Sequence, residues 1–384
     1  MADPLLNAIN SVTNKVIWPK QITDQFFRAI PFFTFLRDKA IMDFNGGTLM
    51  QYAFMFNALL GGSYAPGTAF NIDKVDTIAA LQFREKYYEV NVTEFMEEIQ
   101  VRNKGEAAVF SLLDADLKNA MMTITTIIAI AAWRHGQAAG GAVVDDRSLD
   151  INGLSEALND GTVYSWDGNI FANYGSQARN GAVGAALNSV PRWMGNVNGT
   201  AGKITYETIE DMYQIASQGN LAPDLGVTSK RGMTLIKNTL QVQQRFAQES
   251  DPRYGFEGIR INKALLTKDD YCPSASPAQG GTGANDARLG NFLTGDITNT
   301  LVGTPAGQFP NSTQAPTLNV REVLFLLNTD TWILRVSTDP TYQFGWTGFK
   351  VGQDNTRVSG QTLAALNLEC VANRLNIHGF GFNS

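Results

Sequence analysis

The longest regular pattern of apolar residues in the chain has the spacing of a helix. From about residue 104 to residue 135 no proline interrupts the sequence, and apolar residues recur at steps of three or four: Phe110, Leu113, Leu117, Met121, Ile124, Ile128 and Ala131. This pattern predicts a helix of about 30 residues, roughly 45 Å long. Its second half reads NAMMTITTIIAIAAW and is shorter than the about 20 apolar residues that cross a bilayer. We therefore expect a helix covered on most sides by protein, and no membrane span.

The region before this helix has the two-residue period of β-strands. In TLMQYAFMFN the apolar residues alternate at Met50, Tyr52, Phe54 and Phe56. A Gly/Pro/Ala-rich tip follows, and the chain returns through a second alternating run at Tyr88, Val90 and Val92. The pattern predicts a hairpin of about 15 residues per arm, or about 50 Å. Because an isolated two-stranded hairpin is marginal in water, we expect it to reach a second molecule.

The first 45 residues resemble an arm rather than a domain. A helix is expected from about Thr23, with an apolar face that includes Phe26, Phe27 and Phe33, and Pro31 is expected to kink or divide it. So many phenylalanines need a surface that the arm itself cannot supply. We expect that surface on another part of the protein or on a neighbouring subunit.

The second half of the chain alternates predicted strands and helices, which is typical of a mixed α/β domain. TYETIEDMYQIASQ predicts a helix, APDLGVTSKRGMTLIKNTLQ a strand followed by a helix, and REVLFLLNTDTWILRV two strands. Residues 271–320 hold few charges and many Gly, Thr, Asn and Pro residues, so long loops are expected there. A terminal strand is predicted from the alternation of Leu366, Leu368, Cys370 and Ala372.

Composition and motifs provide little sign of chemistry. The 384 residues carry a net charge of −6, which argues against a dedicated nucleic-acid binder, although a wall that must not adhere to DNA would also be mildly acidic. Cys272 and Cys370 lack CxxC spacing, and neither His135 nor His378 has a metal-ligand neighbour. The glycine-rich stretches do not match a phosphate-binding loop, and no nucleophile elbow occurs. We expect no cofactor, no metal and no enzymatic activity, in a soluble protein made in a cytoplasm.

The order of these elements is the most informative signal. IPFFTFLRDKAIMDFNGGTLMQYAFMFNALLGGSYAPGTAF and FREKYYEVNVTEFMEEIQVRNKGEAAVFSLLDADLKNAMMTITTIIAIAAWRHG resemble the arm, extended loop, strand and long helix of the major capsid proteins of tailed bacteriophages. FLLNTDTWILRV and LAALNLECVANRLNIHGF resemble that family's return into its peripheral domain. The family shares its shell fold with the herpesvirus capsid floor and with encapsulins.

The resemblance implies an α+β fold with four parts. These are an N-terminal arm (1–45), an extended β-hairpin loop (46–86), a peripheral domain (87–142 and 341–384) with a spine helix at about 104–135, and an α/β axial domain (143–340) with loop-rich insertions at about 137–200 and 271–320. Because the family's arm and loop lie on neighbouring subunits, the implied contact residues are Phe26, Phe27, Phe32, Phe33, Met50, Tyr52, Phe54, Phe56, Tyr64 and Lys74. Some relatives cross-link such a lysine to an asparagine, but Lys74 also fits an ordinary solvated charge.

The resemblance further implies assembly with copies of itself into hexamers and pentamers. The icosahedral head would form in the host cytoplasm with a scaffolding protein and a portal, could carry decoration proteins, and would enclose double-stranded DNA in the virion without reading its sequence. Two alternatives stay open. One is an encapsulin-like cellular compartment with the same fold, and the other is an α/β hydrolase-like enzyme with a helical lid.

Overall fold

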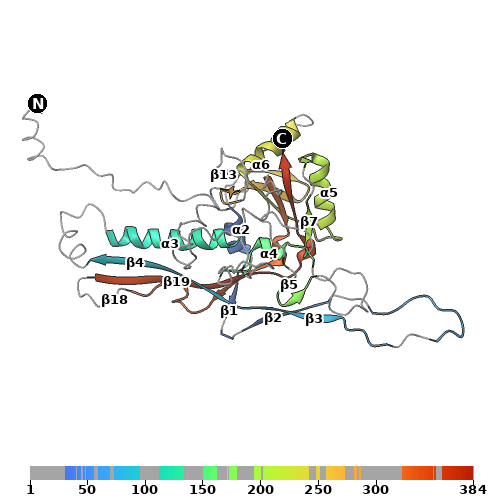
Figure 1. Ribbon diagram of the computed structural model, residues 1–384, viewed down its shortest axis with the longest axis horizontal. Coiled ribbons are helices and arrows are strands. Elements are labelled where there is room, and N and C mark those ends of the chain that lie inside the picture. Colours follow the sequence, from blue (N-terminus) through green and yellow to red (C-terminus); the bar gives the residue numbers. More distant parts are fainter. Residues whose placement is uncertain are drawn as a thin grey trace, which may run out of the picture.

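The computed structural model describes the chain in segments. These are residues 31–39, 41–44, 46–47, 49–55, 59–69, 73–95, 112–133, 136, 150–161, 171, 173–179, 194–199, 202–241, 248–250, 257–272, 281–282, 285–286, 322–348, 350–351 and 357–383. Three features dominate the described part: a long helix on a pair of long strands, a second unit of sheet and helices, and a loop that projects from the base of both (Figure 1).

The described elements form two large sheets with helices against them. The helices are α2 (Pro31–Lys39), α3 (Leu112–Ala131), α4 (Leu154–Ala157), α5 (Tyr206–Ala216) and α6 (Lys230–Gln241), with 3₁₀ turns η5 (Thr329–Thr331) and η6 (Asn373–Leu375). The six-stranded sheet contains β1 (Ile41–Phe44), β4 (Lys86–Phe95), β16 (Trp332–Ser337), β17 (Gln343–Trp346), β18 (Lys350–Val351) and β19 (Arg357–Cys370). The eight-stranded sheet contains β7 (Asn196–Asn198), β8 (Gly202–Lys203), β9 (Leu225–Thr228), β10 (Gln248–Ser250), β11 (Glu257–Ile261), β12 (Ala264–Lys268), β15 (Glu322–Leu327) and β20 (Ile377–Asn383). The strand pairs are β2 (Met50–Met55) with β3 (Ile78–Phe83), β5 (Asn173–Tyr174) with β6 (Gln177–Ala178), and β13 (Gly281–Thr282) with β14 (Asn285–Asp286).

Of the predicted 104–135 the structure describes residues 112–133, and the helix is confirmed over Leu112–Ala131, where it ends in a turn. Ile124, Ile128 and Ile130 are fully buried, as expected for the apolar second half. Its threonines are also accounted for, since Thr126 is buried, the Thr125 hydroxyl donates to the Met121 carbonyl at 2.8 Å, and the Thr123 hydroxyl donates to the Asn119 side-chain oxygen at 3.5 Å. None of the described helices is long and apolar enough to cross a membrane.

The strand alternation is confirmed, but the strand pairing differs from the expected hairpin. In β4 the side chains of Tyr88, Val90 and Val92 are buried, and those between them are exposed. However, β4 pairs with β19 in antiparallel register and lies under α3, while β2 pairs with β3 over only six residues each. The predicted hairpin of about 15 residues per arm was therefore wrong. The glycines and proline of the tip lack the strand propensity that a longer ladder would need.

The two strands expected around residues 328–330 are confirmed, but they lie in different sheets. The chain passes from β15 in the eight-stranded sheet through η5 to β16 in the six-stranded sheet, and it returns from β19 through η6 to β20. The two crossings are joined by Asn376, whose side-chain oxygen accepts from the Asn328 amide at 2.8 Å and the Trp332 indole at 3.0 Å, while its nitrogen donates to Thr331 at 2.9 Å. The Asn376 side chain thus links the two places where the chain changes sheet.

Sheet membership therefore does not follow the expected domain boundaries. β1, expected in the arm, pairs with β16, expected in the axial domain. β20, expected in the peripheral domain, pairs with β15 of the other sheet. The expected limit at 340 falls between β16 and β17 of one sheet, because the chain changes sheet earlier, at η5.

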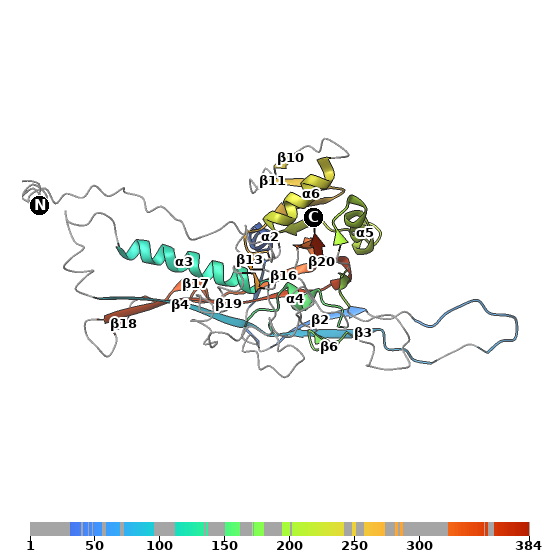
Figure 2. The same cartoon turned by 45° about the horizontal axis from the view of Figure 1, so that its top comes forward.

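The α/β unit predicted for the second half is confirmed in the described residues. The hydroxyl of Thr205, the residue before α5, accepts a hydrogen bond from the Thr208 amide, and α5 and α6 lie against the eight-stranded sheet (Figure 2). Ile209, Met212 and Ile236 from these helices form a core with Leu266 and Leu324 of the sheet.

Candidate subunit interface

Among the described residues, an exposed apolar surface lies on the loop between β2 and β3 and on the strand ends that lead into it. The loop projects away from both sheets (Figure 1). Met55 is 82% exposed, Leu59 77% and Ile78 62%. Large apolar side chains gathered on one projecting segment typically mark a contact surface.

The base of this loop is tied firmly to the rest of the subunit. Met50 and Phe83 are buried, and β2 buries alternate residues in the order the sequence predicts. The turn between β5 and β6 binds the outer edge of β3, because the Gln82 amide donates to the Gly175 carbonyl at 2.9 Å and the Gln177 side chain donates to the Ala80 carbonyl at 2.7 Å. The loop thus has a fixed base and an exposed apolar end.

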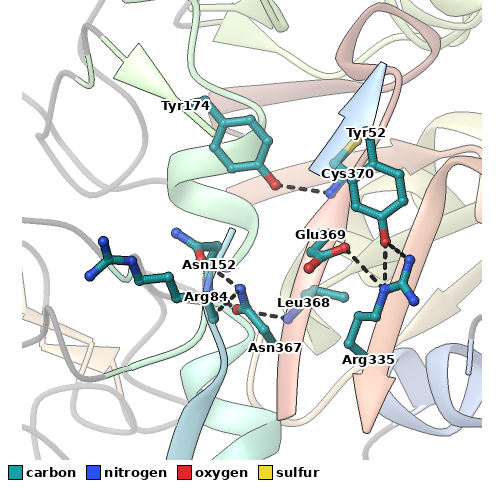
Figure 3. Close-up of polar contacts among 9 residues, drawn as sticks. All are labelled: Tyr52, Arg84, Asn152, Tyr174, Arg335, Asn367, Leu368, Glu369 and Cys370. Carbon is teal, nitrogen blue, oxygen red and sulfur yellow. Dashed lines mark hydrogen bonds and ion pairs between the residues drawn. The ribbon is translucent and has the colours of Figure 1, made fainter. Parts of the chain in front are cut away.

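A polar cluster joins the other strand, β2, to the six-stranded sheet (Figure 3). The Nε of Arg335 donates to the Tyr52 hydroxyl at 2.6 Å, and a second guanidinium nitrogen donates to the same oxygen. The guanidinium carbon lies 5.1 Å from the centre of the Tyr52 ring, and Nε lies 3.6 Å from the Glu369 carboxylate. Burial raises the pKa of Glu369 to about 7, against the opposing effects of Tyr52 and Arg335.

A second polar cluster in Figure 3 fastens the neighbouring part of β19. The Asn367 side chain donates to the Arg84 carbonyl at 2.9 Å and exchanges hydrogen bonds with Asn152. The Tyr174 hydroxyl accepts from the Cys370 amide at 2.9 Å. Arg84 and Tyr174, which contact β19 here, lie beside the loop base. Contacts between segments far apart in the sequence therefore bury the polar residues at this end of β19.

The predicted contact residues divide into three groups. The first group is buried in the subunit's own core and contains Phe32, Phe33 and Met50. The ring centres of Phe32 and Trp133 lie 5.0 Å apart. Tyr52 and Phe54 are half-buried at the loop base, while Tyr64 and Lys74 are exposed beyond it. Phe26, Phe27 and Phe56 lie outside the described residues.

The interface prediction needs one correction for the first group. α2 begins at Pro31, where a missing amide is tolerated, and the Phe32 amide donates to the buried Asp269 carboxylate at 3.1 Å. The surface that these phenylalanines require is therefore supplied by their own chain. Phe32, Phe33 and Met50 expose too little side chain to contribute much to a contact with a neighbour.

Several residues of this surface escaped the sequence analysis. Met55, Leu59, Leu60 and Ile78 are more exposed than most of the predicted contacts. Leu59 and Leu60 had a signal, because they lie beside the glycines of ALLGG, where a regular strand or helix is disfavoured. Arg335 carried a weaker signal, a charge inside the apolar run WILRV.

Among the described residues, no group of three His, Cys, Asp or Glu could hold a metal ion. Cys272 and Cys370 are free and buried, and His378 is buried with its ring stacked 5.9 Å from Phe325 and from Phe380. These groups serve packing.

The chain has the α+β fold of phage capsid subunits, as the solved structures similar to it show. A chain of the cyanophage A-1(L) capsid asymmetric unit aligns with a TM-score of 0.65 at 12% identity, covering 98% of this chain and 99% of that chain. The holo-SrpI encapsulin complex from Synechococcus elongatus PCC 7942 aligns at 0.56 and 9% identity, covering 100% and 96%. The capsid of a native GTA particle aligns at 0.54 and 8% identity, covering 98% and 100%. No family model and no curated protein matches the sequence.

Proposed function

We propose that this chain is a structural, non-enzymatic subunit that assembles with copies of itself into hexamers and pentamers of an icosahedral phage head. The observation that carries the proposal is the projecting loop, whose apolar side chains Met55, Leu59 and Ile78 stay in solvent in one subunit. A loop of this kind on a shell-forming fold is explained if a neighbouring subunit covers it.

Assembly by shared burial suits this surface. Each loop contact would stabilise the shell modestly, and the many contacts of a closed shell would add to a large total. The net charge of −6 suits an inner wall that encloses double-stranded DNA without binding it tightly. A scaffolding protein and a portal are proposed partners during assembly in the host cytoplasm.

An encapsulin-like compartment is the second candidate, favoured by the similarity to the encapsulin complex at a TM-score of 0.56. The two functions share the fold and differ in contents. A phage head takes up DNA through a portal, whereas a compartment encloses a cargo protein.

Negative-stain electron microscopy of the purified protein tests the proposal. We expect closed shells, capsomers or tubes, and nuclease treatment followed by analysis of the contents distinguishes DNA from protein cargo once the genes beside it are expressed together. A dispersed monomer at every salt and protein concentration tested would contradict the shell function. Turnover of model esters by that monomer would favour the hydrolase alternative instead.

A further inference from the structure

We propose that Arg335 is a positioning residue, held by Glu369, that fixes the direction in which the extended loop leaves the subunit through its contact with Tyr52. The importance of that direction for assembly rests on the proposed function, but the positioning itself concerns one subunit. Three elements distant in sequence meet here: β2, β16 and β19 (Figure 3).

The strand register brings Arg335 and Glu369 together. In the antiparallel pair of β16 and β19, Arg335 lies opposite Asn367 and Ile333 lies opposite Glu369. Residues two apart on a strand, and residues directly opposite, share a face of the sheet. Arg335 and Glu369 therefore occupy diagonal positions on one face, the face on which the loop base lies.

Glu369 restricts where the guanidinium can go. Its side chain has no exposed surface, and the groups that act on its carboxylate are the Arg335 guanidinium and the Tyr52 hydroxyl. A buried carboxylate is costly without a compensating charge, and the Arg335 guanidinium at 3.6 Å is that charge. Arg335 is thereby kept on this face rather than extended into solvent, although its side chain is 21% exposed.

The restrained guanidinium then holds the middle of β2. It donates two hydrogen bonds to the Tyr52 hydroxyl, and its carbon lies 5.1 Å from the centre of the Tyr52 ring, so it opposes displacement of this side chain. Tyr52 pairs with Leu81 of β3 within a ladder of only six residue pairs. Since the β5–β6 turn binds β3 and Arg335 binds β2, each strand of this short ladder has one external restraint.

A small change at the base produces a large change at the tip. The chain from residue 52 to residue 63 can span at most about 36 Å, so a rotation of the base by about 10° displaces the tip by up to about 6 Å. That displacement exceeds the tolerance of a packed apolar contact, which requires atoms to approach within about 4.5 Å. The polar cluster is thus suited to decide whether the exposed apolar residues meet a neighbour correctly.

Distances between two spin labels test this inference in single subunits. One label is placed at the loop tip on Ser63→Cys and the other on the exposed face of α6 on Lys237→Cys, because Cys272 and Cys370 are buried and should not react. Labelled subunits are measured unassembled, or diluted into an excess of unlabelled protein. The test variants are Tyr52→Phe, which keeps the ring but removes the acceptor, and Arg335→Lys, which keeps the charge but removes the forked donor. Gln51→Ala is the matched control, an exposed neighbour on the opposite face of β2.

We expect a narrow distance distribution in the parent and in Gln51→Ala, and a distribution broader by several ångströms in both test variants. Circular dichroism verifies that every variant remains folded, so a general loss of stability cannot produce this pattern. An unchanged distribution in folded Tyr52→Phe would overturn the inference, whether or not Arg335→Lys folds. If the distributions broaden but no shells form from the parent, the positioning stands and the proposed function fails.

Discussion

Replacement of Leu59 by serine should weaken assembly without weakening the subunit. Leu59 is 77% exposed in the single subunit, so Leu59→Ser should change the free energy of unfolding by no more than about 0.5 kcal/mol. Full burial of a leucine side chain contributes about 1.5 to 3 kcal/mol. The exposed 77% therefore has about 1 to 2 kcal/mol to gain when a neighbour covers the loop.

The free energy of assembly lost in Leu59→Ser can be measured as a change in the critical concentration for shell formation. If each subunit inserts one loop, a loss of about 1 to 2 kcal/mol raises the critical concentration for shell formation about 5- to 30-fold, since 1.4 kcal/mol corresponds to a factor of ten. Light scattering over a series of protein concentrations gives the critical value, and electron microscopy identifies the particles. Leu59→Met is the matched control and should retain the parental value, because methionine keeps the apolar surface and nearly the same volume.

The reasoning fails if folded Leu59→Ser assembles at the parental concentration. The apolar side chain would then remain in solvent in the shell, and the loop would need another explanation. An equal rise of the critical concentration in Leu59→Met would also contradict the reasoning, because the effect would then depend on the shape of the side chain rather than on the burial of apolar surface.

Three further predictions concern the subunit itself. Ile128→Asp places a carboxylate at a fully buried site of α3, and we expect no folded subunit by circular dichroism. Burial raises the pKa of Glu156 from 4.5 to about 7, so its contribution, up to about 3 kcal/mol, is present below pH 4.5 and lost as the pH rises through 7. The melting temperature should fall between pH 5 and 8, and Glu156→Gln should flatten that profile. Asp269→Ala leaves the Phe32 and Tyr271 amides without their acceptor, at about 1 to 3 kcal/mol, and hydrogen exchange in α2 should accelerate.

Local patterns predicted the elements more reliably than their partners. The step of three or four residues along α3 and the alternation along β4 each reflect which side of one element is buried, and the structure confirms both. The buried side of a strand does not show which other strand it pairs with. β15 buries all six of its residues, so its sequence contains no face that would indicate the sheet to which it belongs.

The sequence also did not show which residues cover the phenylalanines of the arm. The phenylalanines of the arm indicated that a surface was needed, but no pattern in residues 31–39 identifies Asp269 and Trp133 as that surface. The loop cluster shows the same limit, because Tyr52 and Arg335 are 283 positions apart. A charge within an apolar strand indicates a partner, and only the fold shows which one.

Under the proposed function, folding and assembly would rest on different apolar residues, and exposure separates the two sets. The core between α3, α2 and the sheets contains side chains such as Ile124, Trp133 and Phe325 that are covered almost completely by the subunit itself. The loop and the strand ends that lead into it carry Met55, Leu59 and Ile78, which are mostly exposed and are not part of that core. In the proposed shell, the subunit would be stable before it meets a neighbour, and the free energy of assembly would be small at each contact. Weak individual contacts allow misplaced subunits to dissociate, and a shell closes correctly only if they can.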